Sequence, residues 1–269
     1  MDEKEHMKLT FDDRNSLNFW YPLIADKVLV PTTMYVNFDK WPQRLDDISD
    51  DDLDLIIEAC DQLGYPCFMR TDVFSGKHNY ERTCFIESEK VVKCHLNELL
   101  NYSSMCTIVG LPVNSIVIRE FIEIEHRFKA FEGLPIGNEI RAFVREGEIE
   151  CHHYYWPKAS IKFYGEYRNN IPRDWETELD EMKTYCEGPG WEEIKGVVKE
   201  VAEIMNTKNL HNVDIYPSWS IDFAKGNNGK WYLIDMALGD VSYHPSHDPN
   251  HEEHTNRLQA GKYKLFKED

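Results

Sequence analysis

The sequence has no apolar run close to the roughly 20 residues that a membrane-spanning helix needs. Its first residues, Met1–Lys8, are largely charged and lack the apolar stretch of a secretory signal. From both absences we expect a cytoplasmic protein that does not associate with a membrane. The 269 residues, 42% of them hydrophobic, are still enough for a sizeable core, arranged as one large domain or as two lobes.

The cysteines lack the spacing of a metal or redox motif, because none of them forms a CxxC pair. An odd number of cysteines without a secretory signal predicts reduced thiols, which serve mostly as small buried apolar groups and not as nucleophiles. The seven cysteines are Cys60, Cys67, Cys84, Cys94, Cys106, Cys151 and Cys186.

Basic charge is scarce: 30 lysines and arginines stand against 48 acidic residues, for a formal net charge of −18. A protein that binds the backbone of nucleic acid needs a basic face, so general nucleic-acid binding is not expected. An anionic substrate must instead meet arginines that are placed locally, because the whole molecule offers no general attractive field.

Two nucleotide-binding motifs are also missing. The absence of GxxxxGK[ST] excludes a Walker loop. The KxDG signature of nucleotidyl-transferring nucleic-acid ligases is absent as well, since Lys77 is followed by His-Asn-Tyr. A kinase or a nucleotidyl-transfer reaction, the latter marked by release of AMP or a covalent lysyl-AMP, therefore ranks last among the functions considered.

The pattern of secondary structure favours an α+β protein. A helix is predicted over about Asp50–Leu63, with Ser49 as its N-cap and Gly64 at its end. A second helix with one apolar face is predicted over about Trp191–Thr207. The polar segment 157–190 is expected to be a long irregular excursion. Helices and strands mix without the regular βαβ alternation of a doubly wound sheet.

The remaining predicted elements are short. They are helices near 18–22 and 95–102, and strands at 28–36, 65–70, 84–86, 115–123, 139–145, 148–155, 219–224 and 230–236. Turn residues at 146–147 and 226–229 predict that the last four strands form two hairpins.

Two aspartates lie in strands that are otherwise suited to burial, Asp222 and Asp235. A lone carboxylate is costly to bury in its charged form. Two carboxylates on paired strands can instead share a hard cation, and Mg²⁺ prefers one or two carboxylates together with substrate phosphates. The alternative is that both aspartates point outward or pair with arginines, and the spacing alone leaves both possibilities open.

Three further groups suit a nucleotide. Arg70 ends a strand and is followed by the flexible turn Ser75-Gly76-Lys77, whose glycine, amides and lysine could hold phosphate. The segment Glu120–Glu123 could offer backbone groups to an adenine and a carboxylate to a ribose, or be an ordinary strand end with exposed charges. Glu139 and Arg141 share one strand face, so Arg141 either contacts a triphosphate or pairs internally with Glu139.

The order of these groups resembles that of the ATP-grasp superfamily over about Phe19–Gly239. The segments Arg119-Glu-Phe-Ile, Leu134-Pro-Ile, Glu139-Ile-Arg-Ala-Phe-Val and Cys151-His-His-Tyr-Tyr-Trp-Pro resemble little-characterised ATP-grasp-domain proteins of phage and bacterial genomes. The third of these segments and Tyr232-Leu-Ile-Asp235 are similar, more distantly, to the eukaryotic cell-division-cycle family that helps to assemble a translation initiation factor.

The resemblance implies an α+β, ATP-grasp-like fold of two α+β lobes with a nucleotide cleft between them. Residues 1–35 would be a short N-terminal helix and strand segment, 36–118 the first lobe, and 119–269 the second lobe with the C-terminal tail. The cofactors would be ATP and Mg²⁺. The nucleotide would meet Arg70, Ser75, Gly76, Lys77, Glu120, Phe121, Ile122, Glu123 and Arg141, with Lys77 and Arg141 acting in catalysis, and the metal would meet Asp222 and Asp235.

The sequence departs from the superfamily in four ways. Arg70 stands where many members have lysine, and Arg14 is the nearest counterpart of a further upstream lysine. The late acid-x-Asn metal motif becomes Asp235-Met-Ala237, for which Asp240 could compensate. The large N-terminal substrate domain of many ligases is missing or minimal.

Histidines add two open possibilities. One of the adjacent pair His152 and His153 could enter the cleft, since neighbouring residues of a strand point to opposite faces; polar packing is the favoured alternative. His244, His247, His251 and His254 could bind zinc, but their proline- and acid-rich surroundings favour a solvated tail.

The implied reaction is ATP-dependent ligation, in which a substrate carboxylate becomes an acyl phosphate and an amine or another nucleophile then displaces the phosphate. The alternative is a non-catalytic ATP-binding factor that assembles a partner protein. The expected partners are thus a nucleotide and an unidentified small-molecule or protein substrate.

Overall fold

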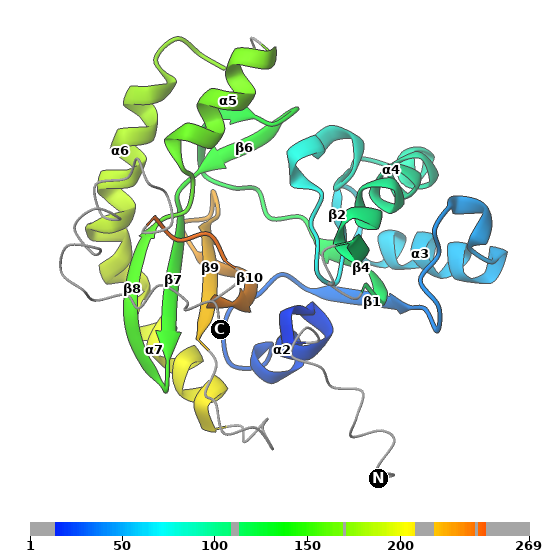
Figure 1. The fold of residues 1–269 in the computed structure, drawn as a ribbon, viewed down its shortest axis with the longest axis horizontal. Helices are drawn as coiled ribbons and strands as arrows, with labels where there is room; N and C mark the ends of the chain where they lie inside the picture. The colour runs from blue at the N-terminus through cyan, green and yellow to red at the C-terminus, as the bar shows by residue number, and fades with distance from the viewer. Residues whose placement is uncertain (1–13, 109–112, 169–170, 208–217, 240–241, 246–269) are drawn as a thin grey trace, which may run out of the picture.

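The computed structural model describes residues 14–108, 113–168, 171–207, 218–239 and 242–245. Two four-stranded antiparallel sheets form the two halves of the molecule, and each carries its helices on its outer face (Figure 1). None of the described helices is long and apolar enough to span a membrane.

The first sheet has the strand order β1–β4–β2–β3. Its strands are β1 (Thr33–Asn37), β2 (Cys67–Thr71), β3 (Phe85–Ile86) and β4 (Ser115–Glu120). Helices α3 (Asp50–Leu63) and α4 (Glu89–Ile108) pack on one face, against buried side chains such as Met69 and Ile118. Because side chains alternate between the faces of a strand, Arg70 and Arg119 point from the opposite face towards the second sheet.

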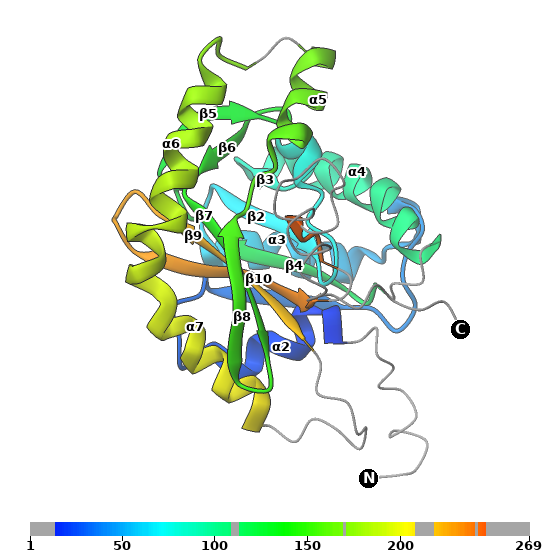
Figure 2. The same ribbon diagram turned by 60° about the vertical axis from the view of Figure 1, so that its left-hand side comes forward.

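The second sheet has the order β10–β9–β7–β8. Its strands are β7 (Glu139–Arg145), β8 (Glu148–Tyr154), β9 (Trp219–Lys225) and β10 (Trp231–Leu238). Helices α6 (Trp175–Glu187) and α7 (Pro189–Thr207) cover the face that carries buried residues such as Ile140 and Ile221. The other face looks towards the first sheet (Figures 1 and 2).

A smaller hairpin closes one end of the space between the sheets. It consists of β5 (His126–Ala130) and β6 (Leu134–Gly137), with α5 (Lys158–Arg168) beside it. The hairpin turn contacts the 3₁₀ segment η3 (Lys77–Arg82): the amide of Tyr80 donates to the carbonyl of Phe131, at 3.3 Å. The loop after β2 is thereby tied to the second half of the chain.

Helix α2 (Leu17–Ile24) joins the two halves at the other end. Its N-cap residue Ser16 donates a hydrogen bond of 2.8 Å to the fully buried carboxylate of Asp72, which follows β2. The other carboxylate oxygen of Asp72 accepts from the amides of Asn114 and Ser115. The neighbouring side chain of Asn15 accepts from the amide of Leu238 in β10, at 2.9 Å. One short segment therefore hydrogen-bonds to both sheets.

The structure confirms the predicted α+β fold, the helix over Asp50–Leu63 with its Ser49 cap, and the two late hairpins. Several bounds differ: β1 is shorter than predicted and α4 longer. The predicted boundaries after residues 35 and 118 fall inside β1 and β4, so the division of the chain into lobes stays a prediction.

The expectation of an irregular excursion over 157–190 is wrong, because this segment forms α5 and α6. Helix α6 buries Trp175, Leu179, Met182 and Cys186, whose spacing of three or four residues is helical. Charged residues between these four positions obscured the helical period in the sequence. The β5–β6 hairpin was also not predicted, since its apolar stretches are short.

Replacing Asp72 with alanine should destabilise the protein by about 3 kcal/mol, because it leaves a buried hydroxyl and two backbone amides without their acceptor. Urea unfolding followed by circular dichroism measures the loss. Asp26→Ala is the matched control: this carboxylate is exposed and pairs at the surface with Lys27, so its removal should change stability by less than about 0.5 kcal/mol. Equal stability of the two variants would contradict a stabilising role for the hydrogen bonds that Asp72 accepts.

Candidate functional site

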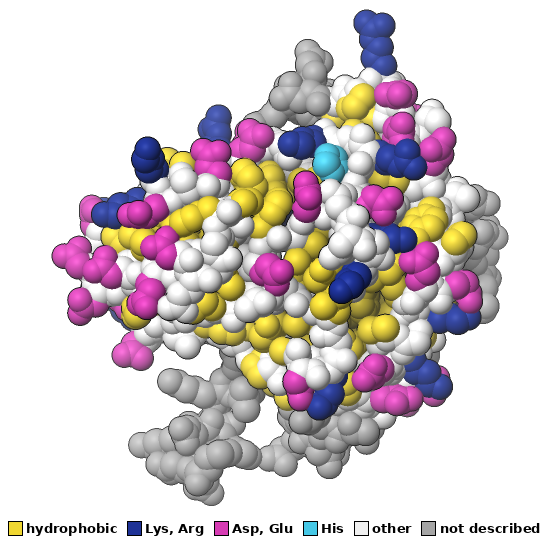
Figure 3. All heavy atoms as spheres, turned by 180° about the vertical axis from the view of Figure 1, so that it is seen from behind, with side chains coloured by type: hydrophobic (Ala, Val, Ile, Leu, Met, Phe, Trp, Pro, Cys, Tyr) yellow, Lys and Arg dark blue, Asp and Glu magenta, His cyan; other side chains and the backbone are white. Residues whose placement is uncertain are grey.

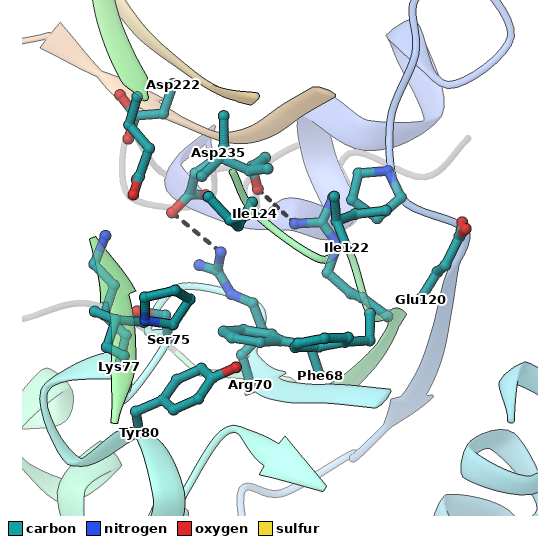
Figure 4. Close-up of a pocket in the computed structure, with 18 of the residues that line it drawn as sticks. Phe68, Arg70, Ser75, Lys77, Tyr80, Glu120, Ile122, Ile124, Asp222 and Asp235 are labelled. Atoms are coloured by element: carbon teal, nitrogen blue, oxygen red, sulfur yellow. Dashed lines mark hydrogen bonds and ion pairs between the residues drawn. The ribbon is translucent and has the colours of Figure 1, made fainter. Parts of the chain in front are cut away.

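A cavity of about 790 Å³, counting the space open to solvent, lies between the facing sides of the two sheets. One end is lined by charged side chains from β2, β4, β7, β9 and β10, and the other by apolar residues from β2, η3, β6 and the chain after β4. Figure 4 shows Arg70 and Lys77 rising from one side towards Asp235 and Asp222 on the other. This arrangement suits an elongated ligand with one apolar and one anionic end.

Arg70 spans the space between the sheets. Its Nη1 lies 3.1 Å from Oδ2 of Asp235, and its Nε donates to the carbonyl of Thr71 at 2.9 Å. The arginine is only 4% exposed. In this structure Asp235 is therefore neutralised by an arginine of the opposite sheet, as the dashed line in Figure 4 marks.

Arg119 lies beside Arg70 and lines the same cavity. Its Nη1 donates to the carbonyl of Ile234, and its Nε to the hydroxyl of Thr33 at 3.1 Å. Its Nη2 is buried and has no hydrogen-bond partner. Burial, and then the charge of Arg70, lower the pKa of Arg119 to about 10. A buried donor without an acceptor is costly, so an anion bound here would satisfy it.

A row of charged side chains crosses the second sheet. Asp235 in β10 is paired with Asp222 in β9, which is paired with Arg141 in β7, which is paired with His153 in β8. Directly paired residues of antiparallel strands share a face and lie about 5 Å apart. The row is therefore a consequence of strand register.

Arg141 holds Asp222 through both carboxylate oxygens, with Nε and Nη2 each donating at 2.7 Å. This planar, two-bond geometry is the strong form of an arginine–carboxylate pair. Burial acts to lower the pKa of Arg141, but the Asp222 charge outweighs it and the pKa is raised. Arg141 pairs with Asp222 and not with Glu139, its neighbour on the strand.

Lys77 lines the cavity and lies among aromatic rings. Its Nζ donates to the hydroxyl of Tyr155 at 2.5 Å and lies 4.1 Å and 4.8 Å from the ring centroids of Tyr155 and Trp156. Gly76, with φ of 68°, provides the left-handed turn that aims the lysine inward. A Cβ there would lie 3.2 Å from the side chains of Leu99 and Thr83, so glycine also fits the close packing.

Glu139 is a buried acid beside this lysine. The indole Nε1 of Trp156 donates to its Oε1 at 2.6 Å. Burial raises the pKa of Glu139 to about 7, against the opposing effects of Lys77 and Trp156. The acid therefore changes its charge near neutral pH, within the cavity wall.

The apolar end is formed by Phe68, Tyr80, Ile122, Ile124 and Leu134, among others. Residues 121–123 connect the two sheets and belong to no strand, so their backbone groups are not used in a sheet ladder. A flat heterocycle could lie between these side chains and hydrogen-bond to that backbone.

The acidic side chains of this connection lie at or beyond the edge of the cavity. Glu120 borders the cavity, but its Oε2 accepts from the amide and hydroxyl of Thr32, and Figure 4 shows it at the edge of the cavity. Glu123 is exposed and does not line the cavity; its carbonyl accepts from the amide of Asn227. Neither carboxylate is placed to meet a ribose deep in the cavity.

The structure brings most of the predicted residues to one cavity. Those that line it are Arg70, Ser75, Lys77, Glu120, Phe121, Ile122, Asp222 and Asp235. Gly76 shapes the loop without lining the cavity, and Arg141 acts through Asp222. Their roles in binding stay predictions.

Sequence reasoning missed several lining residues: Phe68, Tyr80, Arg119 and Trp156, as well as Tyr155, which holds Lys77. Arg119 could have been found, because its period-two spacing from Val117 places it on the face opposite Ile118. The aromatic residues gave no signal, since nothing in their local sequence separates them from core residues.

The histidines divide as strand alternation predicts. His153 is buried on the face of Arg141, while His152 stacks on Trp191 of α7 at 3.9 Å. Arg14 is buried but does not line the cavity. Of the predicted zinc ligands only His244 is described; His247, His251 and His254, like Asp240, lie outside the described residues.

A metal would meet a limited donor set. Among the described residues, no group of three or more histidine, cysteine or acidic side chains is arranged to hold a metal ion. Asp222 and Asp235 lie side by side, but each pairs with an arginine. The two carboxylates fit Mg²⁺ in the way that nucleotide sites use it, with substrate phosphates supplying the remaining oxygen ligands.

No family model matches the sequence, and a search of curated proteins found no match. Among solved structures, the chain resembles C-terminally truncated Cdc123 from Schizosaccharomyces pombe, with 12% identity and a TM-score of 0.51, over 94% of this chain and 91% of that one.

Two other solved structures are similar at lower scores. PurK, an N5-carboxyaminoimidazole ribonucleotide synthetase in an ADP complex, matches at 12% identity and a TM-score of 0.45, over 88% of this chain and 48% of that one. The ATP-grasp ligase PsnB, complexed with minimal precursor, Mg and ADP, matches at 11% identity and a TM-score of 0.40, over 86% of this chain and 52% of that one. The chain spans about half the length of these two proteins.

The predicted resemblance to the cell-division-cycle family is thus confirmed at the level of the fold. ATP-grasp proteins are among the structural neighbours at lower scores. The fold is α+β. At these sequence identities the likeness to Cdc123 concerns the fold alone, and the chemistry must be argued from the cavity of this chain.

Stability should fall as pH rises from about 4.5 to 7. The raised pKa of Glu139 means that the folded protein keeps this proton after the unfolded chain has lost it, so deprotonation favours unfolding. The loss attributable to Glu139 is on the order of 3 kcal/mol. Comparing Glu139→Gln with the unsubstituted protein by urea unfolding at pH 5 and pH 8 isolates it. A pH dependence that is the same in both proteins would contradict the prediction.

Proposed function

We propose that this protein binds ATP with Mg²⁺ in the cavity between its two sheets and uses it as an ATP-dependent ligase. The observation that supports this is the charge at one end of the cavity. Arg70 and Arg119 are buried there, with Lys77 and the half-buried Arg141 beside them, against the carboxylates of Asp222 and Asp235 and a readily neutralised Glu139. A site with surplus positive charge in a chain of net charge −18 favours a polyphosphate.

The charge on the outer surface differs from the charge in the cavity. Seen from behind, the molecule carries scattered acidic groups that gather towards the side of α3, with lysines and arginines dispersed between them (Figure 3). On this face no continuous basic area is seen among the described residues. The face seen in Figure 3 therefore lacks the basic area that a nucleic-acid backbone needs, whereas the cavity offers an anion several cations.

The orientation of the nucleotide follows from the two ends of the cavity. The adenine would lie among Phe68, Ile122 and Leu134, with its edge at the backbone of 121–123. The phosphates would lie against Arg70, Arg119 and Lys77. This order agrees with the predicted roles of Arg70, the Ser75-Gly76-Lys77 turn and the connection after β4.

Phosphate binding would release the metal ligands. Oxygens of the triphosphate can replace Asp235 as the partner of Arg70 and can meet the unpartnered Nη2 of Arg119. Asp235 would then be available, with Asp222, for Mg²⁺. When bound, Mg²⁺ would offset phosphate charge and orient the transferred group. The residues of this chain thus favour metal binding after, or together with, nucleotide.

In the proposed reaction the terminal phosphoryl group of ATP passes to a substrate carboxylate, giving an acyl phosphate and ADP. An amine or another nucleophile then displaces inorganic phosphate. Arg70, Lys77 and Arg141 would offset the charge that develops, with positioning contributing most of the rate. Two lower-scoring structural neighbours were crystallised with ADP, the synthetase PurK and the ATP-grasp ligase PsnB.

A second function has its own support. The match to Cdc123 covers nearly all of both chains, whereas the matches to PurK and PsnB cover about half of theirs. The predicted resemblance to a factor-assembly family, together with Asp235-Met-Ala237 in place of acid-x-Asn, favours an ATP-binding assembly factor in which nucleotide orders the two halves for a partner protein.

Incubation with Mg-ATP and pooled metabolites separates the two functions. A ligase should release ADP and yield a new conjugated mass. An assembly factor should bind ATP in isothermal titration calorimetry, release no ADP and co-purify with a partner. Failure to bind ATP at millimolar concentration would refute both. Release of AMP would instead support the nucleotidyl-transfer reaction.

Replacing Arg119 with glutamine should weaken ATP binding by about 10- to 100-fold, since a buried, charge-assisted hydrogen bond to phosphate contributes roughly 1.5–3 kcal/mol. Calorimetry measures the affinity. The matched control is Arg145→Gln, because Arg145 pairs at the surface with Glu150 and should leave affinity unchanged. An equal effect of both substitutions would argue against a phosphate contact.

Asp235→Asn should remove the effect of magnesium. In the unsubstituted protein, ATP should bind more tightly with Mg²⁺ than with EDTA, and Mg²⁺ alone should bind weakly because Arg70 holds Asp235. In Asp235→Asn the two ATP affinities should become equal, and any ADP release should be abolished. If the variant, folded as judged by circular dichroism, keeps the magnesium effect or normal turnover, Asp235 is not a metal ligand.

A further inference from the structure

A cysteine and a histidine meet beyond the charged end of the cavity. Sγ of Cys151, in β8, lies 3.1 Å from Nε2 of His244. The histidine is only 3% exposed, while the cysteine is half-buried and so partly accessible. The two residues are 93 positions apart in the sequence, so the contact is made by the tertiary structure.

The pair lies on the side of the phosphate end away from the adenine end. In β8, His153 is paired with Arg141, and Cys151 is paired with Phe143. The Phe143–Cys151 pair lies two residues beyond the Arg141–His153 pair, in the direction away from Glu139. Two residues of a strand span about 7 Å. A nucleotide that extends from residues 121–123 towards Asp222 would direct its last phosphate towards Cys151.

The backbone links the pair to the charged row. Nη1 of Arg141 donates to the carbonyl of Tyr243, the residue before His244, at 3.2 Å. The guanidinium that holds Asp222 therefore also positions the chain that carries the imidazole. A group bound at the phosphate end would therefore share one sheet face with Cys151.

Aromatic side chains hold the imidazole of His244 beside the thiol. The imidazole of His244 packs against the ring of Phe143, at 4.8 Å, and against His153, at 5.7 Å. The nearest described charge in the row is the arginine Arg141. Glu150, the residue before Cys151, is engaged by Arg145 and by the hydroxyl of Ser218, which donates to its Oε2 at 3.3 Å. Cysteines beside an imidazole in a positive, partly accessible setting are the reactive ones.

We propose that Cys151 and His244 form a nucleophilic site that accepts an acyl group from an acyl phosphate. This deepens the proposed ligase function and rests on it. The thiol proton passes to Nε2 of His244. The thiolate sulfur attacks the carbonyl carbon, the bond from that carbon to the phosphate oxygen breaks, and inorganic phosphate leaves with the electron pair. The product is a thioester on Cys151, from which an amine can take the acyl group.

Acetyl phosphate is a direct probe, because it needs neither ATP nor the natural substrate. Intact-protein and peptide mass spectrometry would follow acetylation at each cysteine. Cys94, exposed on α4, is the internal control. Cys151 should be acetylated at least tenfold faster than Cys94, and His244→Gln should lower the Cys151 rate at least tenfold while leaving Cys94 unchanged. Urea unfolding checks that the variant is folded, and Cys151→Ser should remove the fast-reacting site.

Alkylation with iodoacetamide at pH 6 supplies a second readout. It should label Cys151 well ahead of Cys94, and His244→Gln should abolish this advantage. Equal rates at Cys151 and Cys94 in both assays would overturn the proposal. So would fast alkylation without S-acetylation, or complete protection by micromolar Zn²⁺, which would indicate a metal site. Because neither probe uses ATP, failure here is distinguishable from failure of ATP binding.

Discussion

The structure depends on keeping arginines buried between two sheets of an acidic protein. Removing a charge from water costs several kcal/mol even after relaxation, so each buried arginine needs an acceptor nearby. Asp235 and Asp222 provide acceptors for Arg70 and Arg141, and carbonyl and hydroxyl groups provide two for Arg119. Nη2 of Arg119 is buried but has no hydrogen-bond acceptor. The closed arrangement of the two halves therefore holds together while keeping a capacity for one more anion.

The same strands build the core and the site. Antiparallel register aligns Asp235, Asp222, Arg141 and His153 across one face of the second sheet, and alternation places Ile140 and Ile221 on the other face, under α6 and α7. A shift by one residue would bury the charges and expose the core. The charged row is thus fixed by the same constraint that fixes the hydrophobic packing. Rigid placement on strands suits a site whose work is positioning.

The two proposed functions share the nucleotide site and differ in what happens after binding. The paired arginines, the aromatic setting of Lys77 and the apolar end of the cavity serve either one. A ligase needs in addition a place for the acyl group, and the contact between Cys151 and His244 offers such a place beyond the phosphate end. An assembly factor needs a surface that changes when nucleotide joins the two halves, for which the Arg70–Asp235 contact between the sheets is the natural point of exchange.

The sequence by itself determined the elements with strong local signals. These are the capped helix over Asp50–Leu63 and the two hairpins of the second sheet, because caps, turns and periodicity act between near neighbours. Only the tertiary structure decided that Arg70 reaches Asp235, that Arg141 pairs with Asp222 and not with Glu139, and that Trp156, Tyr155 and Arg119 complete the wall. Those contacts join segments far apart in the chain, and their energies depend on burial and distance, which no local pattern encodes.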